Sequence, residues 1–337
     1  MNYRTLQDLN SAVNSLAHEL SDDFDLIVGI PRSGLLVANL LALQLNKPLS
    51  DIDRLLEGTV IGSGKRLEAN ANFQDFNRVL VVDDSVYSGD QLAQTRSRIE
   101  SQRFPFDIEY ASIYITPQCY NIVDHWHEVL DPPRVFEWNI MHHEHLSNMC
   151  VDIDGVLCRD PSDGENDDGE NYIEFLTTVE PKITPTKEIG WLVTCRLEKY
   201  RDQTENWLDT HGIEYQNLVM MDLPDMETRK RQGNHARFKS EVYRETGADL
   251  FIESSPYQAA DIAKLSGKPV LDFESNQIIT PDLIPATIQK TGAVKKGFAT
   301  YLKEFLKDPV SFPGRFYKFV KKRLVRMKDK LYLRLKY

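Results

Sequence analysis

The chain has 337 residues, of which 41% are apolar and 27% charged, with a formal net charge of −11. This length predicts about two domains, and the composition is that of a globular protein able to bury hydrophobic cores. No apolar run approaches the roughly 20 residues of a membrane span, residues 1–16 lack a secretory signal pattern, and the cysteines favour a reducing cytoplasm over disulfides: Cys119, Cys150, Cys158 and Cys195.

Strands and helices are expected to alternate in the first half of the chain. The strand candidates cover residues 24–30, 78–84 and 106–116, and the helix candidates cover 35–46 and 90–102. This alternation predicts an α/β fold, with a doubly wound, Rossmann-like parallel sheet covered on both faces. Ligands of such sheets bind beyond the carboxyl ends of the strands, where loops 31–34 and 83–91 fall.

The loop DDSVYSGDQ at residues 83–91 combines two carboxylates with a turn of small residues. Its second half opens a helix whose free N–H groups, one hydroxyl and one glycine suit an anion. These residues are Tyr87, Ser88, Gly89, Asp90 and Gln91. Asp83 and Asp84 suit the vicinal hydroxyls of a sugar, or Mg²⁺ bound to that sugar. Phosphate and diol sites side by side describe a ribose 5-phosphate.

This loop resembles the motif with which type I phosphoribosyltransferases bind 5-phosphoribosyl 1-pyrophosphate (PRPP). The resemblance covers about residues 20–116. It includes GIPRSG at 29–34, which looks like the family's pyrophosphate loop, and GSGKRL at 62–67, which looks like its mobile loop. The resemblance implies further PRPP contacts from Arg32, Ser33, Gly34, Lys65 and Arg66. Asp90 departs from the family pattern, and we expect it to cap the helix and point away from the phosphate.

Residues 118–148 contain no recognisable nucleobase hood. They carry five histidines and three large aromatic side chains, Trp126, Phe136 and Trp138. Aromatic faces suit a sugar or another flat ligand. The histidines at positions 142, 143 and 145 could hold a metal, but no cysteine or carboxylate set completes it. Ordinary, partly buried polar residues are therefore the favoured interpretation.

A second carboxylate motif, DIDG at residues 152–155, opens the other half of the chain. Alternate residues of an extended strand point the same way, so Asp152 and Asp154 can reach one phosphate. With Mg²⁺, one carboxylate can attack phosphorus while the other protonates the leaving oxygen and then activates water. Three polar residues follow at the ends of later elements, namely Thr194, Lys239 and Glu253.

These residues, in this order, resemble the haloacid dehalogenase superfamily of phosphohydrolases over about residues 148–275. The resemblance implies that Asp152 is the nucleophile and Asp154 the acid/base, whose main-chain carbonyl binds Mg²⁺. Thr194 and Lys239 would stabilise charge, and Glu253 would complete a metal site with the two aspartates. The family more often has an aspartate pair where this chain has Glu253, Ser254 and Ser255, which implies weaker Mg²⁺ binding.

The insertions and the end of the chain suggest the kind of substrate. Besides the acidic loop 162–172, no stretch is long enough for a large lid, so we expect a bulky phosphorylated substrate. Residues 295–337 hold 14 Lys/Arg and three acidic residues. Within them, residues 308–337 alternate apolar and basic positions at helical spacing, which favours binding to an anionic membrane surface. Docking on the acidic body of the protein is the alternative, and RNA binding ranks third.

The sequence thus predicts two doubly wound, Rossmann-like parallel-sheet domains, at residues 1–147 and 148–290, followed by a basic amphipathic helical tail at residues 291–337. The pairing of the first two resembles bacterial surface-polysaccharide enzymes that transfer 5-phosphoribosyl from PRPP to a glycan and then remove the 5-phosphate. A lipid-linked acceptor, no nucleic acid, and a cytoplasmic location at the inner face of the membrane would follow. The alternatives are a nucleobase-salvage phosphoribosyltransferase fused to a nucleotide phosphatase, and a non-catalytic PRPP sensor.

Overall fold

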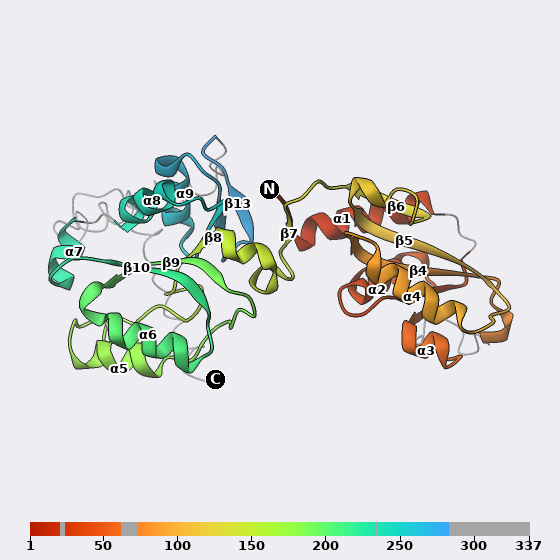
Figure 1. Ribbon diagram of the computed structural model, residues 1–337, viewed down its shortest axis with the longest axis horizontal. Helices are drawn as coiled ribbons and strands as arrows, with labels where there is room; N and C mark the ends of the chain where they lie inside the picture. Colours follow the sequence, from red (N-terminus) through yellow and green to blue (C-terminus); the bar gives the residue numbers. More distant parts are fainter. Residues whose placement is uncertain (21–23, 62–72, 233–234, 283–337) are drawn as a thin grey trace, which may run out of the picture.

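The protein consists of two α/β units joined by a short pair of strands (Figure 1). The computed structural model describes residues 1–20, 24–61, 73–232 and 235–282. The predicted α/β fold class, with two parallel-sheet units, is confirmed within these residues. Two predicted parts lie outside the described residues: Lys65 with Arg66, and the basic segment 291–337.

The first unit is built on a five-stranded sheet in the order β3-β2-β4-β5-β6, in which all neighbours are parallel. Its strands are β2 (Leu26–Gly29), β3 (Leu49–Asp51), β4 (Arg78–Val86), β5 (Asp107–Ile115) and β6 (His125–Val129). Its helices are α1 (Leu6–Glu19), α2 (Gly34–Leu45), α3 (Ile52–Leu56) and α4 (Asp90–Glu100).

The continuous apolar run of β4 follows from the helices on both faces of this sheet. Leu80 and Val82 point into a core that also contains α1 and α2. Val79 and Val81 point to the other face, where α3 and α4 pack. Because side chains alternate along a strand, both faces must be apolar, and no polar residue interrupts the strand before Asp83.

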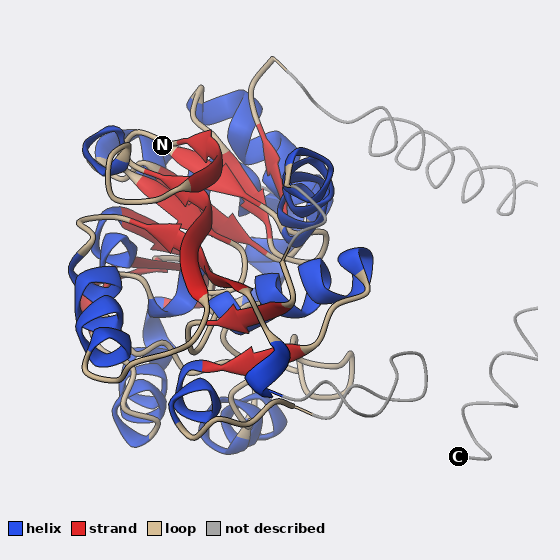
Figure 2. Ribbon diagram, turned by 90° about the vertical axis from the view of Figure 1, so that its right-hand side faces the viewer, coloured by secondary structure: helices blue, strands red, loops and turns tan. Residues whose placement is uncertain are grey.

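The second unit is built on a six-stranded sheet in the order β10-β9-β8-β11-β12-β13, parallel except for its last pair. Helices α5 and α6 cover one face, and α8 and α9 cover the other (Figure 1). Seen along the long axis of the molecule, the strands lie between helices (Figure 2). The strands are β8 (Met149–Val151), β9 (Ile189–Leu197), β10 (Tyr215–Met221), β11 (Leu250–Glu253), β12 (Val270–Asp272) and β13 (Gln277–Ile279). The helices are α5 (Glu170–Thr178), α6 (Arg201–Thr210), α7 (Met226–Gln232), α8 (His235–Glu245) and α9 (Pro256–Ser266).

The connection between the units is a structured neck made of β1 (Asn2–Arg4) and β7 (Arg134–Phe136), which pair in parallel. Along β7, Val135 is buried in the core of the second unit, whereas Phe136 is buried in the core of the first. On β1, Arg4 forms an ion pair with Glu128 of β6. The neck therefore packs on both units and is not a free linker.

Across the described ranges, no helix has the length and apolarity needed to cross a membrane.

Candidate active sites

The paired carboxylates of the first unit, Asp83 and Asp84, lie near the C-terminal end of β4, at the carboxyl edge of the sheet. The hydroxyl of Ser33 donates to Oδ1 of Asp84 at 2.7 Å, and the indole N–H of Trp138 donates to Oδ2 at 2.9 Å. Asp84 is 4% exposed, so these two donors fix the carboxylate of a residue that solvent hardly reaches.

Asp83 has different hydrogen-bond partners from Asp84, and its pKa is shifted. Its Oδ1 accepts the backbone N–H of Asp84 at 2.9 Å. Burial, strengthened by repulsion from Asp84, raises the pKa of Asp83 to about 8. At neutral pH the Asp83 carboxyl therefore holds a proton, and a carboxyl in this state can both donate to and accept from a sugar hydroxyl.

The predicted pyrophosphate loop lies directly against this pair. A Cβ atom at Gly34 would lie 2.7 Å from the carbonyl oxygen of Val82 and 3.0 Å from Oδ1 of Asp83, so only glycine permits this close approach. Ser33 makes the contact to Asp84 described above, and Arg32 is exposed in the same loop. The structure thus brings Ser33 and Gly34 to the acid pair, and Arg32 lies exposed beside them in the same loop.

The predicted phosphate loop follows β4. Gly89 has a φ of +89° and caps the N-terminus of α4. The hydroxyl of Ser88 donates to Oδ2 of Asp90 at 2.7 Å, and the side-chain amide of Gln91 donates to the carbonyl of Pro31 at 3.3 Å. Asp90 lies in the first helical turn, and the cap itself is glycine, so the expectation that Asp90 is the cap is wrong. Its carboxylate instead holds the Ser88 hydroxyl.

Of the three aromatic residues singled out in the sequence, one lies at this site. Trp138 stacks on Phe136 with ring centroids 4.7 Å apart, and Phe136 is itself a buried core residue. Trp126 packs edge-on against Tyr120, away from the acid pair. Trp138 therefore offers an aromatic surface held beside Asp84 by its own N–H.

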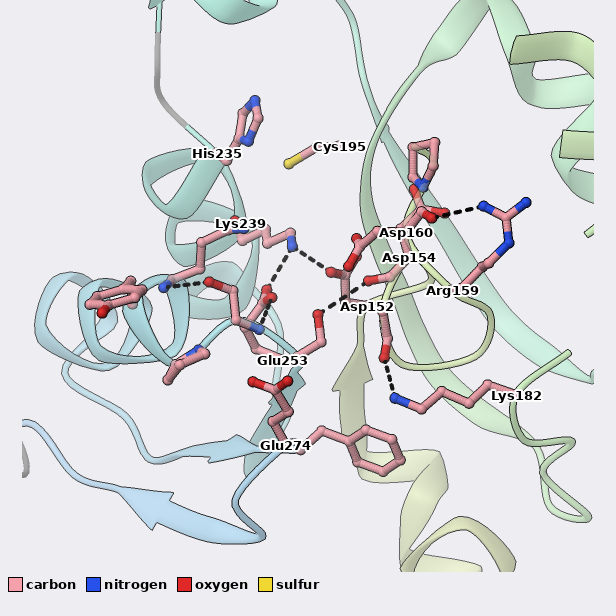
Figure 3. A pocket seen from close by; sticks show the side chains of 18 of the residues that line it. Asp152, Asp154, Arg159, Asp160, Lys182, Cys195, His235, Lys239, Glu253 and Glu274 are labelled. Carbon is pink, nitrogen blue, oxygen red and sulfur yellow. Dashed lines mark hydrogen bonds and ion pairs between the residues drawn. The ribbon is translucent and has the colours of Figure 1, made fainter. Parts of the chain in front are cut away.

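In the second unit, one buried ammonium joins two carboxylates (Figure 3). Nζ of Lys239 donates to Oδ2 of Asp152 at 2.7 Å and to Oε2 of Glu253 at 2.6 Å. Asp152 follows β8, Glu253 ends β11, and Lys239 comes from α8, so the carboxyl edge of the sheet assembles them. Burial raises the pKa of Asp152, and attraction to Lys239 opposes this shift.

Asp154 is held by a cation that the sequence analysis did not select. Arg196 is fully buried, and its guanidinium donates to Oδ1 of Asp154 at 2.7 Å through Nη2 and contacts both carboxylate oxygens at 3.2 Å through Nε. The main-chain carbonyl of Asp154 accepts the hydroxyl of Ser254 at 3.4 Å. Arg196 could have been selected from the sequence, because it lies two residues after Thr194, at the end of the same strand.

Thr194 does not lie where the resemblance implies. It is fully buried, and its hydroxyl oxygen accepts the backbone N–H of Arg196 at 3.2 Å. Because side chains alternate along β9, its neighbour Cys195 faces the cavity instead, on the same side as Lys239 and His235 (Figure 3). A direct contact of Thr194 with a phosphate would require this strand end to rearrange.

The carboxylates open into a cavity of about 820 Å³. Its wall mixes acidic, basic and aromatic side chains and includes Asp152, Asp154, Arg159, Asp160, Tyr172, Lys182, Cys195, Arg229, His235, Lys239, Glu253, Ser254, Tyr257, Phe273 and Glu274. The volume is large enough for a sugar phosphate and part of a longer chain.

The acidic loop after Asp160 forms part of the cavity border with α7. Asp168 accepts hydrogen bonds from Nζ of Lys199 at 2.9 Å, the hydroxyl of Tyr200 at 2.9 Å and the backbone N–H of Met226 at 3.1 Å. The loop is thereby tied to the start of α7.

Mg²⁺ is the metal that the resemblance assigns to Asp152, Asp154 and Glu253. In the structure, the ammonium of Lys239 bridges Asp152 and Glu253, and Arg196 holds Asp154. Among the described residues, no three His, Cys, Asp or Glu side chains are grouped closely enough to hold a metal ion. The predicted ligand set does not fit a metal in this arrangement, because protein cations occupy its carboxylates.

The histidines between the two units have separate partners. His142 meets the hydroxyl of Thr186 at 3.0 Å, and His145 meets Oδ2 of Asp249 at 2.8 Å. Nδ1 of His143 accepts the backbone N–H of His145 at 3.1 Å. The favoured interpretation as ordinary polar residues agrees with these contacts.

Comparison with known proteins identifies the first unit. The family described as "Phosphoribosyl transferase domain" matches residues 2–140. No curated protein sequence matches the chain.

Three solved structures illustrate the similarity. Purine phosphoribosyltransferase from Pyrococcus horikoshii is 22% identical, with 41% of this chain and 92% of that chain covered and a TM-score of 0.31. The xanthine-guanine-hypoxanthine phosphoribosyltransferase of Helicobacter pylori is 14% identical, with 41% of this chain and 92% of that chain covered and a TM-score of 0.32. A protein from Neisseria gonorrhoeae with bound ppGpp is 16% identical, with 41% of this chain and 89% of that chain covered and a TM-score of 0.31.

Proposed function

From the premise that residues 2–140 are a phosphoribosyltransferase domain, we propose that this chain transfers 5-phosphoribosyl from PRPP to a glycan hydroxyl and then removes the 5-phosphate. Pyrophosphate leaves in the first reaction and inorganic phosphate in the second. The product is a ribofuranose joined to a glycan of a surface polysaccharide, on a lipid-linked acceptor.

One observation carries this proposal: a diol-binding acid pair and a buried phosphatase-like carboxylate cluster occur in one chain. Asp83 and Asp84 sit between two loops suited to phosphate, as the donor PRPP requires. Asp152 lies at the base of a separate cavity with Lys239. A product of the first site carries the 5-phosphate that the second site would remove.

A saccharide acceptor is supported by Trp138. Its ring is fixed beside Asp84 by the indole N–H, and an aromatic face beside the ribose site can stack on the apolar face of a sugar. The cavity of the second unit, which mixes polar and aromatic side chains, suits the phosphorylated sugar that results.

At the second site, the carboxylate of Asp152 would attack phosphorus and the bond to the ribose oxygen would break. That oxygen would take a proton from Asp154, which must first bind one from solvent and release its ion pair with Arg196. A water molecule, deprotonated by Asp154, would then release phosphate from Asp152. Lys239 lies within 2.7 Å of the attacking carboxylate and would balance the charge of the phosphoryl oxygens. Mg²⁺ is proposed only at the first site, where it would enter bound to the pyrophosphate of PRPP.

The test measures pyrophosphate release from PRPP with a panel of saccharide and nucleobase acceptors. We expect release with a saccharide and none with a base. The double variant Asp83→Asn/Asp84→Asn should lose this release, while hydrolysis of p-nitrophenyl phosphate by the second unit continues.

Each alternative predicts a different result in the same panel. Pyrophosphate release only with a nucleobase acceptor would indicate a base-salvage reaction instead of transfer to a glycan. Release with neither class of acceptor, while PRPP still binds, would favour a PRPP sensor. Unchanged transfer in the double variant would refute the role of the acid pair.

A further inference from the structure

Arg134 is a buried cation without a hydrogen-bond partner. It is 6% exposed, and its Nη1 atom is buried with no partner among the described residues. None of the hydrogen bonds or ion pairs within the described part of the chain involves its guanidinium. A guanidinium has five N–H donors, and burying them unpaired is costly, so native proteins almost always provide an acceptor.

The surroundings of this guanidinium are those of the first site. Its carbon Cζ lies 5.3 Å from the centre of the Tyr87 ring and 5.7 Å from that of Phe136. Burial lowers the pKa of Arg134, and the negative charges of Asp84 and Asp83 oppose that shift. Arg134 thus lies against Tyr87, the first residue of the predicted phosphate loop, and within electrostatic reach of the acid pair.

The acid pair alone does not satisfy this cation. No carboxylate oxygen of Asp83 or Asp84 forms an ion pair with Arg134 among the described contacts, although both act on it through space. The donors of Arg134 are therefore available for an anion brought by the substrate.

The neck holds Arg134 in this position. The next residue, Val135, is buried in the core of the second unit, and Phe136 is buried in the core of the first. Strand β7 also pairs with β1, where Arg134 lies opposite Asn2. A side chain fixed on both sides in this way is preorganised for a ligand, which lowers the entropy lost on binding.

We propose that Arg134 is a PRPP-binding residue of the first site, donated by the neck, which pairs with a phosphate oxygen of the donor. This inference rests on the proposed function only in that the first unit binds PRPP, and it does not depend on the acceptor. It adds a cation from outside the two loops and makes donor binding depend on the strand that joins the units.

The test uses the full chain and the variants Arg134→Met and Arg134→Lys. Dissociation constants for PRPP, ribose 5-phosphate and pyrophosphate are measured by titration calorimetry without acceptor. Loss of charge-assisted hydrogen bonds should weaken PRPP binding about tenfold to a hundredfold in Arg134→Met, and Arg134→Lys should recover part of it. Weakened binding of ribose 5-phosphate alone would assign the 5-phosphate, and weakened binding of pyrophosphate alone would assign the leaving group.

Arg96→Met is the matched control. Arg96 also lies over a tyrosine ring, that of Tyr110 at 4.2 Å, but it donates to the carbonyl of Ile122 and lies on α4. Its PRPP affinity should equal that of the wild type. Unchanged affinity for all three ligands in a folded Arg134→Met protein would overturn the inference. If that variant does not fold, unchanged affinity in Arg134→Lys for all three ligands would do the same, because a lysine cannot reproduce the guanidinium geometry.

Discussion

The adjacent carboxyl groups of Asp83 and Asp84 lie in different surroundings. Asp84 accepts hydrogen bonds from two side-chain donors, the Ser33 hydroxyl and the Trp138 indole. Asp83 accepts one backbone N–H and is buried next to Asp84. Burial therefore places its pKa at about 8, well above the ordinary value.

This difference predicts that Asp83 destabilises the fold as the pH rises. Its pKa is higher in the folded protein than in the unfolded chain, so folding takes up a proton between about pH 4 and pH 8. The cost is absent below this range and complete above it. In Asp83→Asn the cost is removed, so thermal unfolding followed from pH 5 to pH 9 should show a growing advantage of the variant, reaching a few degrees in Tm. Parallel curves for the two proteins would contradict the raised pKa.

Arg196 gives a second prediction at this scale. Replacing it in Arg196→Met leaves the Asp154 carboxylate in a largely buried position without its cation, at a cost of about 3–5 kcal/mol in the free energy of unfolding. Adding Asp154→Asn in the same chain should restore part of that loss, because the unpaired charge is gone. Urea unfolding measures both effects.

Arg201→Met is the control for this pair. Arg201 binds Glu198 and Glu205 at the surface, with about a third of its side chain exposed, and its loss should cost less than about 1 kcal/mol. Equal losses for Arg196→Met and Arg201→Met would mean that the buried pair contributes nothing special.

The carboxylates at strand ends and Lys239 were predicted from the sequence, whereas Arg134 and Arg196 were not. Asp83, Asp84, Asp152 and Glu253 follow apolar strands, and the sequence shows this directly. Arg134 begins a strand of three residues whose partner lies at the start of the chain, so no local pattern marks it. Which side chains of β9 face the cavity depends on the alignment of this strand in the sheet. In the structure Cys195 lines the cavity and Thr194 does not.

At the scale of elements, long strands buried on both faces were the most predictable part of the fold. The strand expected at residues 78–84 is β4, and that expected at 106–116 is β5 (Asp107–Ile115), because helices on both faces demand uninterrupted apolar runs. The neck strands β1 and β7 were not expected. Each has three residues, too few for a periodic signal, and they are held by long-range packing.

The basic segment at residues 308–337 is an element that the sequence alone describes. Deleting it should abolish binding to anionic liposomes in a sedimentation assay, because each Lys or Arg near such a surface adds about 1 kcal/mol of attraction. Transfer and phosphatase activities measured in solution should persist. Liposomes of neutral lipid are the control and should bind neither protein.

A different result would favour the alternative for this segment. If the truncated protein loses both activities and precipitates, the segment contributes to the stability of the folded body. The basic residues would then complement the acidic remainder of the chain, which carries a net charge of −22 when the +11 of residues 295–337 is subtracted from −11.

At the scale of the whole molecule, the neck makes the two units parts of one structure. Val135 and Phe136 are neighbours in β7 but are buried in different cores. Strand β7 therefore cannot shift against one unit without disturbing the core of the other. Tyr3 of β1 also packs against the second core, and Arg4 binds the first unit.

The order of the two reactions can be tested with a change in the second site alone. Asp152→Asn keeps the size of the nucleophile and removes the charge that attacks phosphorus, and it leaves the first unit unchanged. With PRPP and a saccharide acceptor, the variant should stop at an acceptor that carries a phosphorylated ribose. Mass spectrometry should find it about 80 Da heavier than the wild-type product, the mass of one HPO₃ group.

Wild-type protein added after removal of PRPP should convert this intermediate to the wild-type product, which shows that the phosphate is the second unit's substrate. A dephosphorylated product from Asp152→Asn alone would mean that the second unit is not the phosphatase of this step. No transfer by a folded variant that still binds PRPP would mean that dephosphorylation does not follow transfer. Because Asp152 lies in a buried cluster with Lys239, the melting temperature of the variant must first be compared with that of the wild type, so that a lost fold is not mistaken for a lost reaction.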